Sequence, residues 1–334
     1  MKRKFAEISA VIVCLMILAV SAYRDSNPHT VSQSQGDRLT IGVIALQDDQ
    51  FQRLLQLAMK READRQGAEV MMTNSGSQLA REVDAIESYV EKRVDGLCIS
   101  PVSVEASMPA LKKAYEEGVK IYSVHMSMED DFQSGYIEMD QEGLGKITGE
   151  ACRAYIEKKL GGKARIGILQ FKSQLADMSA RRTKGFLSAI KEMPRVEVVA
   201  DMDAWMVSSG VSTATEMISA NPEIDIIWAA NEGGTISATL AVKNTGNAGK
   251  IVVFGTDSGE QIAKMLLADD NILQFVTGQD PDTMGKVAMQ SIINTIRGKE
   301  IKKRTVIPGI PLSRENPEEV EAYLEDMKIK LKTW

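Results

Sequence analysis

The chain has 334 residues, which is enough for about two domains on the usual relation between length and domain number. Forty Lys and Arg residues against 46 Asp and Glu residues give a formal net charge of −6, which disfavours a general attraction to nucleic acid or anionic lipid. The cysteines Cys14, Cys98 and Cys152 have no paired spacing. We therefore expect neither a disulfide framework nor a zinc site, and we expect Cys98 and Cys152 to be buried thiols.

Residues 1–37 have the pattern of an export signal or membrane anchor followed by a polar tether. Residues 2–4 are basic and precede an apolar stretch over residues 8–20, after which come small residues and a polar run. Cleavage after Ala22 and retention as an anchor both remain open, since the apolar stretch is shorter than a comfortable membrane span. In either case we expect the folded part to work outside the cytoplasm, in the periplasm or on the outer face of the cytoplasmic membrane.

From Leu39 onward an apolar run, a turn and an amphipathic helix repeat at intervals of roughly 25 residues, which is typical of successive βα units. The segments 51–66 and 78–93 show the three- and four-residue apolar spacing of helices. Short apolar strands separated by helices predict parallel sheets covered on both faces. The expected strands are 39–45, 68–73, 96–100, 120–124, 164–170, 196–202, 224–230, 250–256 and 272–277.

Residues 125–146 are expected to form a long connection, because they are rich in charges and glycines, and to carry the chain into a second domain. After the last strand we expect a helix over 284–297, a strand-like stretch over 304–310 and a closing helix over 317–330. The predicted fold class is α/β, with two doubly wound parallel-sheet lobes joined by hinge crossovers. The expected division is 1–37 for the signal or anchor and tether, 38–139 and 280–307 for the N-terminal lobe, and 140–279 and 308–334 for the C-terminal lobe with the closing helix.

Catalytic motifs are scarce. The histidines are His29, in the tether, and His125, at a strand end, which leaves little material for histidine triads or histidine-rich metal sites. The sequence has no G-x-S-x-G, H-E-x-x-H, G-x-x-x-x-G-K-[ST] or strand-following G-x-G-x-x-G pattern. We expect no enzyme activity, no cofactor and no metal. A secreted enzyme acting on a small metabolite is the alternative, with His125 as its histidine candidate.

Polar and aromatic residues follow several of the predicted strands. Because the carboxyl ends of parallel strands lie at the same edge of a sheet, these side chains should meet at one crevice. Asp257, which precedes Ser-Gly-Glu, would also suit a helix cap. The strand-end residues are Asp48, Asp49 and Phe51 after the first strand, His125 after the fourth, and Asn231, Asp257 and Gln279 after later strands.

Several of these stretches, taken in order and spacing, resemble the ribose-type sugar-binding proteins of bacterial ABC importers, which have the type I periplasmic binding protein fold. The resemblance covers the chain from Leu39 to about Pro311, and an export signal stands where the related LacI-type repressors have a helix-turn-helix. It is carried by TIGVIALQDDQFQRLLQLAMKREADRQGAEV, VDGLCISPVS, SARRTKGF, IIWAANEGGTISATLAV, VVFGTDSGE and TGQDPDTMG.

The resemblance implies a ligand site and a role for its residues. Phe51 and Trp205 would stack on the apolar faces of a sugar ring, while charged and amide groups hold its hydroxyls. Trp205 could instead be a partly buried core aromatic, and Arg182 a surface ion pair on its helix. The glycines Gly233 and Gly234 would let the backbone approach a ligand before a helix begins. The implied ligand-binding residues are Asp49, Phe51, His125, Arg182, Trp205, Asn231, Asp257 and Gln279.

Two departures from the ribose-binding pattern bear on the ligand. His125 and Met126 stand where ribose binders carry Asp-Arg, and Asp48 and Asp49 stand where they carry Asn-Asn. Losing a charged hydroxyl clamp would cost several kcal/mol for ribose, so we expect another neutral sugar or an amino sugar. The resemblance implies a monomer that closes two lobes on its ligand and delivers it to an ABC permease. A membrane sensor kinase or chemoreceptor is the alternative partner.

Overall fold

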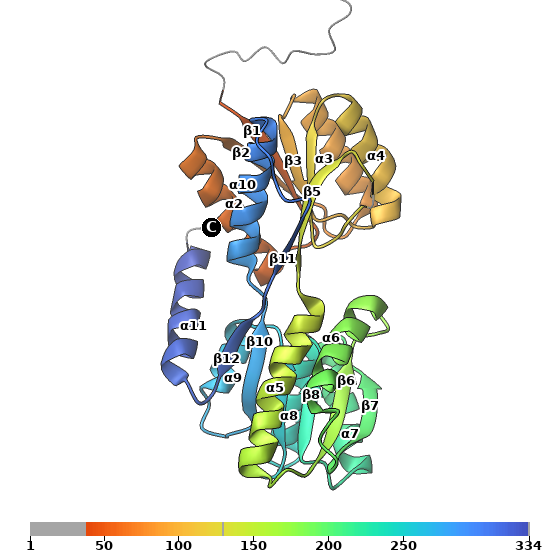
Figure 1. The fold of residues 1–334 in the computed structure, drawn as a ribbon, viewed down its shortest axis with the longest axis vertical. Coiled ribbons are helices and arrows are strands. Elements are labelled where there is room, and N and C mark those ends of the chain that lie inside the picture. The colour runs from red at the N-terminus through yellow and green to blue at the C-terminus, as the bar shows by residue number, and fades with distance from the viewer. Residues whose placement is uncertain (1–37, 129, 333–334) are drawn as a thin grey trace, which may run out of the picture. The chain divides into compact units, whose positions relative to one another are not determined.

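The computed structural model describes residues 38–128 and 130–332. The expected export signal and tether, residues 1–37, lie outside these described residues. The described part contains two six-stranded sheets flanked by helices (Figure 1). Each sheet is parallel throughout, except that β12 pairs antiparallel with β10 at one edge of the second sheet. The predicted α/β class with two doubly wound parallel sheets is confirmed.

The first sheet has the strand order β11-β5-β4-β3-β1-β2. Helices α2 and α10 pack together on one side of this unit, and α3 and α4 pack together elsewhere in it. Its strands are β1 (Thr40–Ala45), β2 (Glu69–Asn74), β3 (Gly96–Ile99), β4 (Lys120–Val124), β5 (Gln133–Met139) and β11 (Arg304–Ile307). Its helices are α2 (Gln50–Gln66), α3 (Leu79–Glu91), α4 (Val104–Glu116) and α10 (Pro281–Ile296).

The second sheet has the strand order β12-β10-β9-β8-β6-β7. The chain passes between the sheets after β5, after β10 and between β11 and β12. Its strands are β6 (Ala164–Gln170), β7 (Val196–Asp203), β8 (Ile226–Ala229), β9 (Val252–Thr256), β10 (Leu273–Gly278) and β12 (Ile310–Ser313). Its helices are α5 (Gln141–Lys159), α6 (Ala176–Ile190), α7 (Val207–Ala220), α8 (Glu232–Asn244), α9 (Glu260–Leu266) and α11 (Pro317–Lys332).

Apolar side chains cover both faces of each sheet, as the unalternating strands predict. In β1, Val43 packs with α2 and α10 on one face, whereas Ile44 packs with α3 and α4 on the other. In β8, Ile227 faces the cluster built with α7, α8, α9 and α11, and Trp228 faces the cluster built with α5 and α6. Strands buried on both faces need apolar residues at successive positions, which explains the near-continuous apolar runs.

The expectation of a long connection over 125–146 is wrong, because this segment contains β5 and the start of α5. Strand β5 pairs with β4 on one side and β11 on the other. Its polar residues have internal partners: Lys303 Nζ donates to the Gln133 carbonyl, and Arg304 Nε donates to Glu138 Oε1 over 2.8 Å. These long-range partners let a sequence with polar residues and glycine form a central strand.

The single strand-like stretch expected over 304–310 is also two strands, β11 and β12, which lie in different sheets. Pro308 separates them, and a proline cannot donate a backbone hydrogen bond to a sheet. Helix α10 begins at Pro281, earlier than expected, where Asp280 caps it by accepting from the Thr283 N–H over 2.9 Å. The closing helix is confirmed as α11 and extends to Lys332.

The two cysteines of the described part, Cys98 and Cys152, are free and buried, as expected. Burial raises the pKa of both thiols well above the ordinary value, so neither has the thiolate character of a reactive cysteine. Among the described residues, no helix is both long and apolar enough to serve as a membrane span.

Candidate functional site

Asp257 lies at the end of β9 and collects donors from three other segments. Arg182 Nη1 donates to its two oxygens over 3.3 Å and 3.1 Å, and Gln279 Nε2 donates to Oδ1 over 2.8 Å. The Glu232 N–H, at the start of α8, donates to Oδ2 over 3.0 Å. The backbone of Asp257 has a φ of +70°, a conformation uncommon for residues other than glycine. This carboxylate therefore joins β9, β10, α6 and α8 at the carboxyl edge of the second sheet.

Arg182 is buried, with 2% of its surface exposed, so the alternative of a surface ion pair is wrong. Besides Asp257, it donates from Nε to Gln141 Oε1 and from Nη1 to the Ala230 carbonyl, each over 2.8 Å. Its guanidinium carbon lies 5.3 Å from the centre of the Phe171 ring. A buried charge needs such partners, because an unpaired one would cost several kcal/mol. Arg182 thus fixes the position of Asp257.

Asn231 is buried and has partners within the protein for both of its side-chain polar atoms. Its Oδ1 accepts from the Gly234 N–H over 3.2 Å and caps α8, and its Nδ2 donates to the Trp205 carbonyl over 2.9 Å. Helix α8 begins at Glu232, so Gly233 and Gly234 lie inside its first turn and do not precede it. A Cβ atom at Gly233 would lie 2.1 Å from the Trp205 carbonyl oxygen. The close backbone approach is therefore to the loop that carries Trp205.

Trp205 lies in the segment between β7 and α7 and is 36% exposed, so its ring is only partly buried. Its ring centre is 5.6 Å from that of Phe171, with 37° between the ring planes. Phe171 is itself buried and lies near Arg182. The exposed part of Trp205 is thus an aromatic surface supported from below by a buried ring.

The first sheet contributes residues from the ends of β1 and β4. Asp49 caps α2 by accepting from the Gln52 N–H over 2.8 Å, and Phe51 follows in the first turn. The ring centres of Phe51 and His125 are 5.1 Å apart. His125 has a φ of +74°, and its N–H donates to the Ile137 carbonyl over 2.7 Å. The structure thus brings Phe51 and His125 together at the carboxyl edge of this sheet.

Charges from the second sheet reach the residues of the first. Burial and, to a smaller extent, the positive charge of Arg182 lower the pKa of His125 to about 4. Burial also raises the pKa of Glu232 to about 7, assisted by the negative charges of Asp257 and Asp49. These interactions place the strand ends of both sheets in one electrostatic environment.

Glu232 is not among the site residues predicted from the sequence, although it lies between Asn231 and Gly233. An acidic residue in the first turn of a helix is ordinarily explained by the helix dipole. Its proximity to Asp49 could not be inferred, because it depends on how α2 and α8 approach each other. A carboxylate directly after a strand-end asparagine is the signal that was available.

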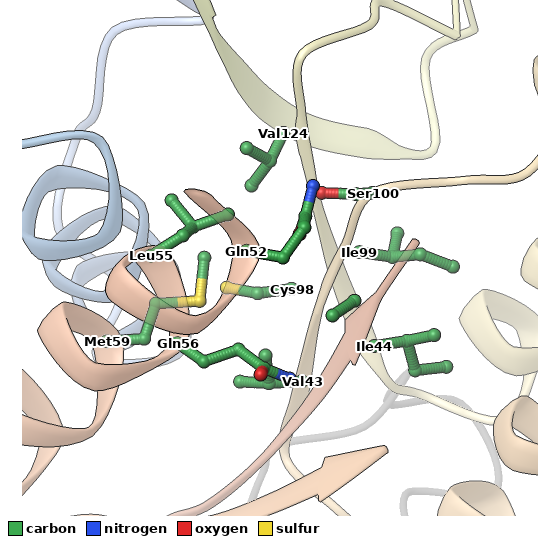
Figure 2. A pocket seen from close by; sticks show the side chains of 11 residues that line it. Val43, Ile44, Gln52, Leu55, Gln56, Met59, Cys98, Ile99, Ser100 and Val124 are labelled. Carbon is green, nitrogen blue, oxygen red and sulfur yellow. The ribbon is translucent and has the colours of Figure 1, made fainter. Parts of the chain in front are cut away.

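A narrow gap lies between α2 and the carboxyl ends of β1, β3 and β4 (Figure 2). Gln52 and Gln56 extend from α2 toward it among apolar side chains, and the Gln52 amide points toward Ser100. Gln52 is 4% exposed, and its buried Oε1 has no hydrogen-bond partner. The gap is too narrow for a water molecule, so in this conformation it is part of the packed interior beside Phe51.

The described residues contain no group of three or more His, Cys, Asp or Glu side chains arranged to hold a metal ion. What the strand ends offer is a buried arginine-carboxylate pair, amide groups and two aromatic surfaces. Carboxylates and amides can hold the hydroxyls of a polyol, and rings can cover its apolar faces. The arrangement is suited to holding a small polar molecule.

Known proteins are similar to this chain in sequence and architecture. The ribose import binding protein RbsB of Bacillus subtilis (strain 168) is 23% identical over 307 residues, which cover 90% of this chain and 96% of that protein. A solute binding protein from Actinobacillus succinogenes 130z with bound D-allose has a TM-score of 0.74 at 21% identity, covering 85% of this chain and 100% of that one.

The fructose binding periplasmic domain of a hybrid two component system has a TM-score of 0.70 at 22% identity, covering 89% of this chain and 98% of that domain. Residues 41–300 match the family described as the periplasmic binding protein domain. The chain therefore belongs to the periplasmic binding protein domain family.

Proposed function

We propose that this protein captures a monosaccharide or a similar small polyol outside the cytoplasm and delivers it to an ABC importer. The main support for the proposal is that polar and aromatic side chains at the strand ends of two sheets lie close together, in a chain of this family. Arg182 and Asp257 form the buried base of the site, and Phe51 and Trp205 supply ring surfaces. Relatives whose names specify ribose import and a structural neighbour with bound D-allose support a sugar as the ligand.

Two lobes would close on the ligand. We assign residues 38–139 and 280–307 to one lobe and 140–279 and 308–334 to the other, with the crossovers after β5, after β10 and between β11 and β12 as hinges. A ligand that contacts both lobes favours the closed form over the open one. Asp49, Phe51 and His125 would contact it from the first lobe, and Arg182, Trp205, Asn231 and Asp257 from the second, with Gln279 at the hinge.

Asn231 and Arg182 would contact the ligand less than the chemistry of their side chains suggests. Both have internal partners for the atoms discussed above, so they position Trp205 and Asp257, which are better placed to select a ligand. Trp205 and Phe51 retain ring surface, since neither is fully buried. Ribose itself is disfavoured, because His125 replaces a charged clamp at the end of β4.

A sensory role is the second candidate, and the likeness to the periplasmic domain of a two component system favours it. The same ligand-bound form would then signal to a membrane kinase or chemoreceptor. Cross-linking in intact cells, followed by identification of the attached membrane protein, separates the two: recovery of a permease supports transport, and recovery of a kinase or chemoreceptor supports sensing.

Calorimetric titration of the purified monomer with D-ribose, D-allose, D-fructose, L-arabinose, myo-inositol and D-glucosamine tests the function. We expect binding of at least one with a dissociation constant near 1 μM, which is about −8 kcal/mol. Mass spectrometry of any small molecule that copurifies extends the panel. If no sugar or polyol binds and none copurifies, the carbohydrate assignment is wrong. Recovery of a chemically altered sugar after long incubation would instead support the enzyme alternative.

A further inference from the structure

Glu232, in the first turn of α8, and Gln50, in the first turn of α2, both approach Gly259. A Cβ atom built on Gly259 would lie 2.7 Å from Glu232 Oε1 and 3.2 Å from Gln50 Oε1. Gln50 belongs to α2, and its Nε2 also reaches Met327 Sδ of α11 over 2.6 Å. The Glu232 carboxylate therefore lies at a contact between segments that belong to different sheets.

The groups around Glu232 leave its charge without compensation. Arg182 is engaged by Asp257, and Lys264 pairs with Glu260 over 2.6 Å. No ion pair to Glu232 or Asp49 occurs among the described residues. The acidic groups and the tyrosine that face this region are Asp257 before α9, Glu260 in α9, Asp49 at α2, Asp280 before α10 and Tyr323 in α11. The cations nearby act on other carboxylates: Lys328 of α11 on Glu260, and Arg53 of α2 on Asp48 and Asp49.

We propose that Glu232 is a proton-linked specificity residue: it takes up a proton when α2 closes on α8, so that an uncharged ligand binds together with that proton. The inference rests on the proposed function. Asp49 and Glu232 belong to different lobes, so closure brings two carboxylates together, and one proton removes their repulsion. The surrounding protein adds to the effect, since withdrawal from solvent disfavours the charged carboxylate.

The direction in which ligand affinity changes with pH follows from the pKa of Glu232 in the closed form and in the open form. The pKa of Glu232 is about 7 in this arrangement, whereas a solvated glutamate has its ordinary value near 4.3. The closed form therefore binds more protons between these values, and its advantage is lost as the pH rises through about 7. Affinity for a neutral sugar should fall about tenfold between about pH 6 and about pH 8.

The other group in the described part that can titrate near neutral pH is His125. Its pKa is about 4 in this arrangement, so closure can only release a proton from it, which is opposite in sign to the uptake expected of Glu232. Glu260 is paired with Lys264 and has a lowered pKa, so it stays charged between about pH 6 and about pH 8. Glu260→Gln is accordingly a matched control for the removal of one carboxylate near the same surface.

The test is calorimetric titration with whichever neutral member of D-ribose, D-allose, D-fructose and myo-inositol binds most tightly. Wild type and Glu260→Gln should bind about tenfold more weakly at about pH 8 than at about pH 6, and should take up protons near neutral pH when measured in two buffers of different ionisation enthalpy. Glu232→Gln should bind with no proton uptake and should bind no more weakly at about pH 8 than at about pH 6.

Proton uptake that persists in Glu232→Gln would overturn the inference, and so would wild-type affinity that is constant or rises with pH. In those cases binding itself survives, and so does the proposed function. If none of the sugars binds at any pH, the proposed function fails and this inference fails with it.

Discussion

The Arg182 guanidinium and the Asp257 carboxylate form an ion pair over 3.1 Å, with 2% and 16% of their side chains exposed. The pair lies at the carboxyl edge of the second sheet and holds Asp257 where Gln279 and the Glu232 N–H also reach it. Under the proposed function, stability and ligand binding are coupled at this point, because a residue proposed to contact the ligand is also the counter-charge of a buried cation.

Asp257→Ala should weaken sugar binding at least tenfold, about 1.4 kcal/mol, and should also destabilise the fold. The destabilisation arises because Arg182 would keep its buried charge and lose its counter-charge, and breaking a buried pair costs about 3 kcal/mol. Urea unfolding monitored by circular dichroism measures the change in the free energy of unfolding, and titration measures the change in affinity.

Asp257→Asn and the double variant Arg182→Met/Asp257→Ala are the controls for that prediction. The asparagine keeps one of the two acceptor oxygens, and the double variant removes the unpaired charge, so both should be more stable than Asp257→Ala. Equal stability of the double variant and Asp257→Ala would show that the charge of Arg182 is not the cause.

Trp205→Ala should weaken binding at least tenfold with little effect on stability. The ring is 36% exposed and rests on Phe171, so its loss removes a stacking surface and only part of a packed contact. Met206→Ala is a matched control, because Met206 is the next residue and its apolar side chain is 58% exposed. Titration should show a loss for Trp205→Ala alone. Equal affinities of both variants would place the ligand elsewhere.

The sequence was sufficient for the fold class and for several residues at the strand ends, because both depend on local patterns. Apolar runs such as the one ending in Trp228 are long enough for buried strands, and the polar residues that follow must lie at the same edge of a parallel sheet. Strand β5 was missed because the charge of Glu138 is compensated by Arg304, which lies far along the chain.

The roles of individual site residues were harder to predict, since they depend on which hydrogen bonds the protein itself satisfies. Asn231 matched a ligand-binding pattern, yet its amide caps α8 and holds the Trp205 carbonyl. Glu232 is unremarkable as a residue in a helical first turn, and its proximity to Asp49 arises only when helices from the two sheets approach. Sequence patterns do not encode such long-range distances.

The contribution of His125 to the stability of the fold should fall as the pH drops below about 6.5. Its pKa is about 4 in the folded protein and about 6.5 in an unfolded chain, so the unfolded chain binds the proton first. The contribution of His125 is complete above about pH 6.5 and is lost as the pH falls through about 4. His125→Asn should flatten this part of the profile, and asparagine tolerates the left-handed backbone.

Thermal unfolding of wild type and His125→Asn between about pH 4 and about pH 7 measures the difference. Both proteins carry His29 and the same carboxylates, so the other titrations cancel when the two profiles are subtracted. Parallel profiles would mean that His125 titrates as an ordinary histidine.

Gly145→Ala should destabilise the fold and displace Arg182. Helices α5 and α6 cross at Gly145 and Gly185, and a Cβ atom at Gly145 would lie 1.8 Å from the Arg182 carbonyl oxygen. Backbone atoms cannot rotate away as a side chain can, so the helices must separate, and overpacking of this kind costs about 3 kcal/mol. Glu150→Ala, on the exposed side of α5, should change the free energy of unfolding by less than about 0.5 kcal/mol. If Gly145→Ala unfolds in urea like Glu150→Ala and binds sugar with wild-type affinity, the crossing does not determine the position of Arg182.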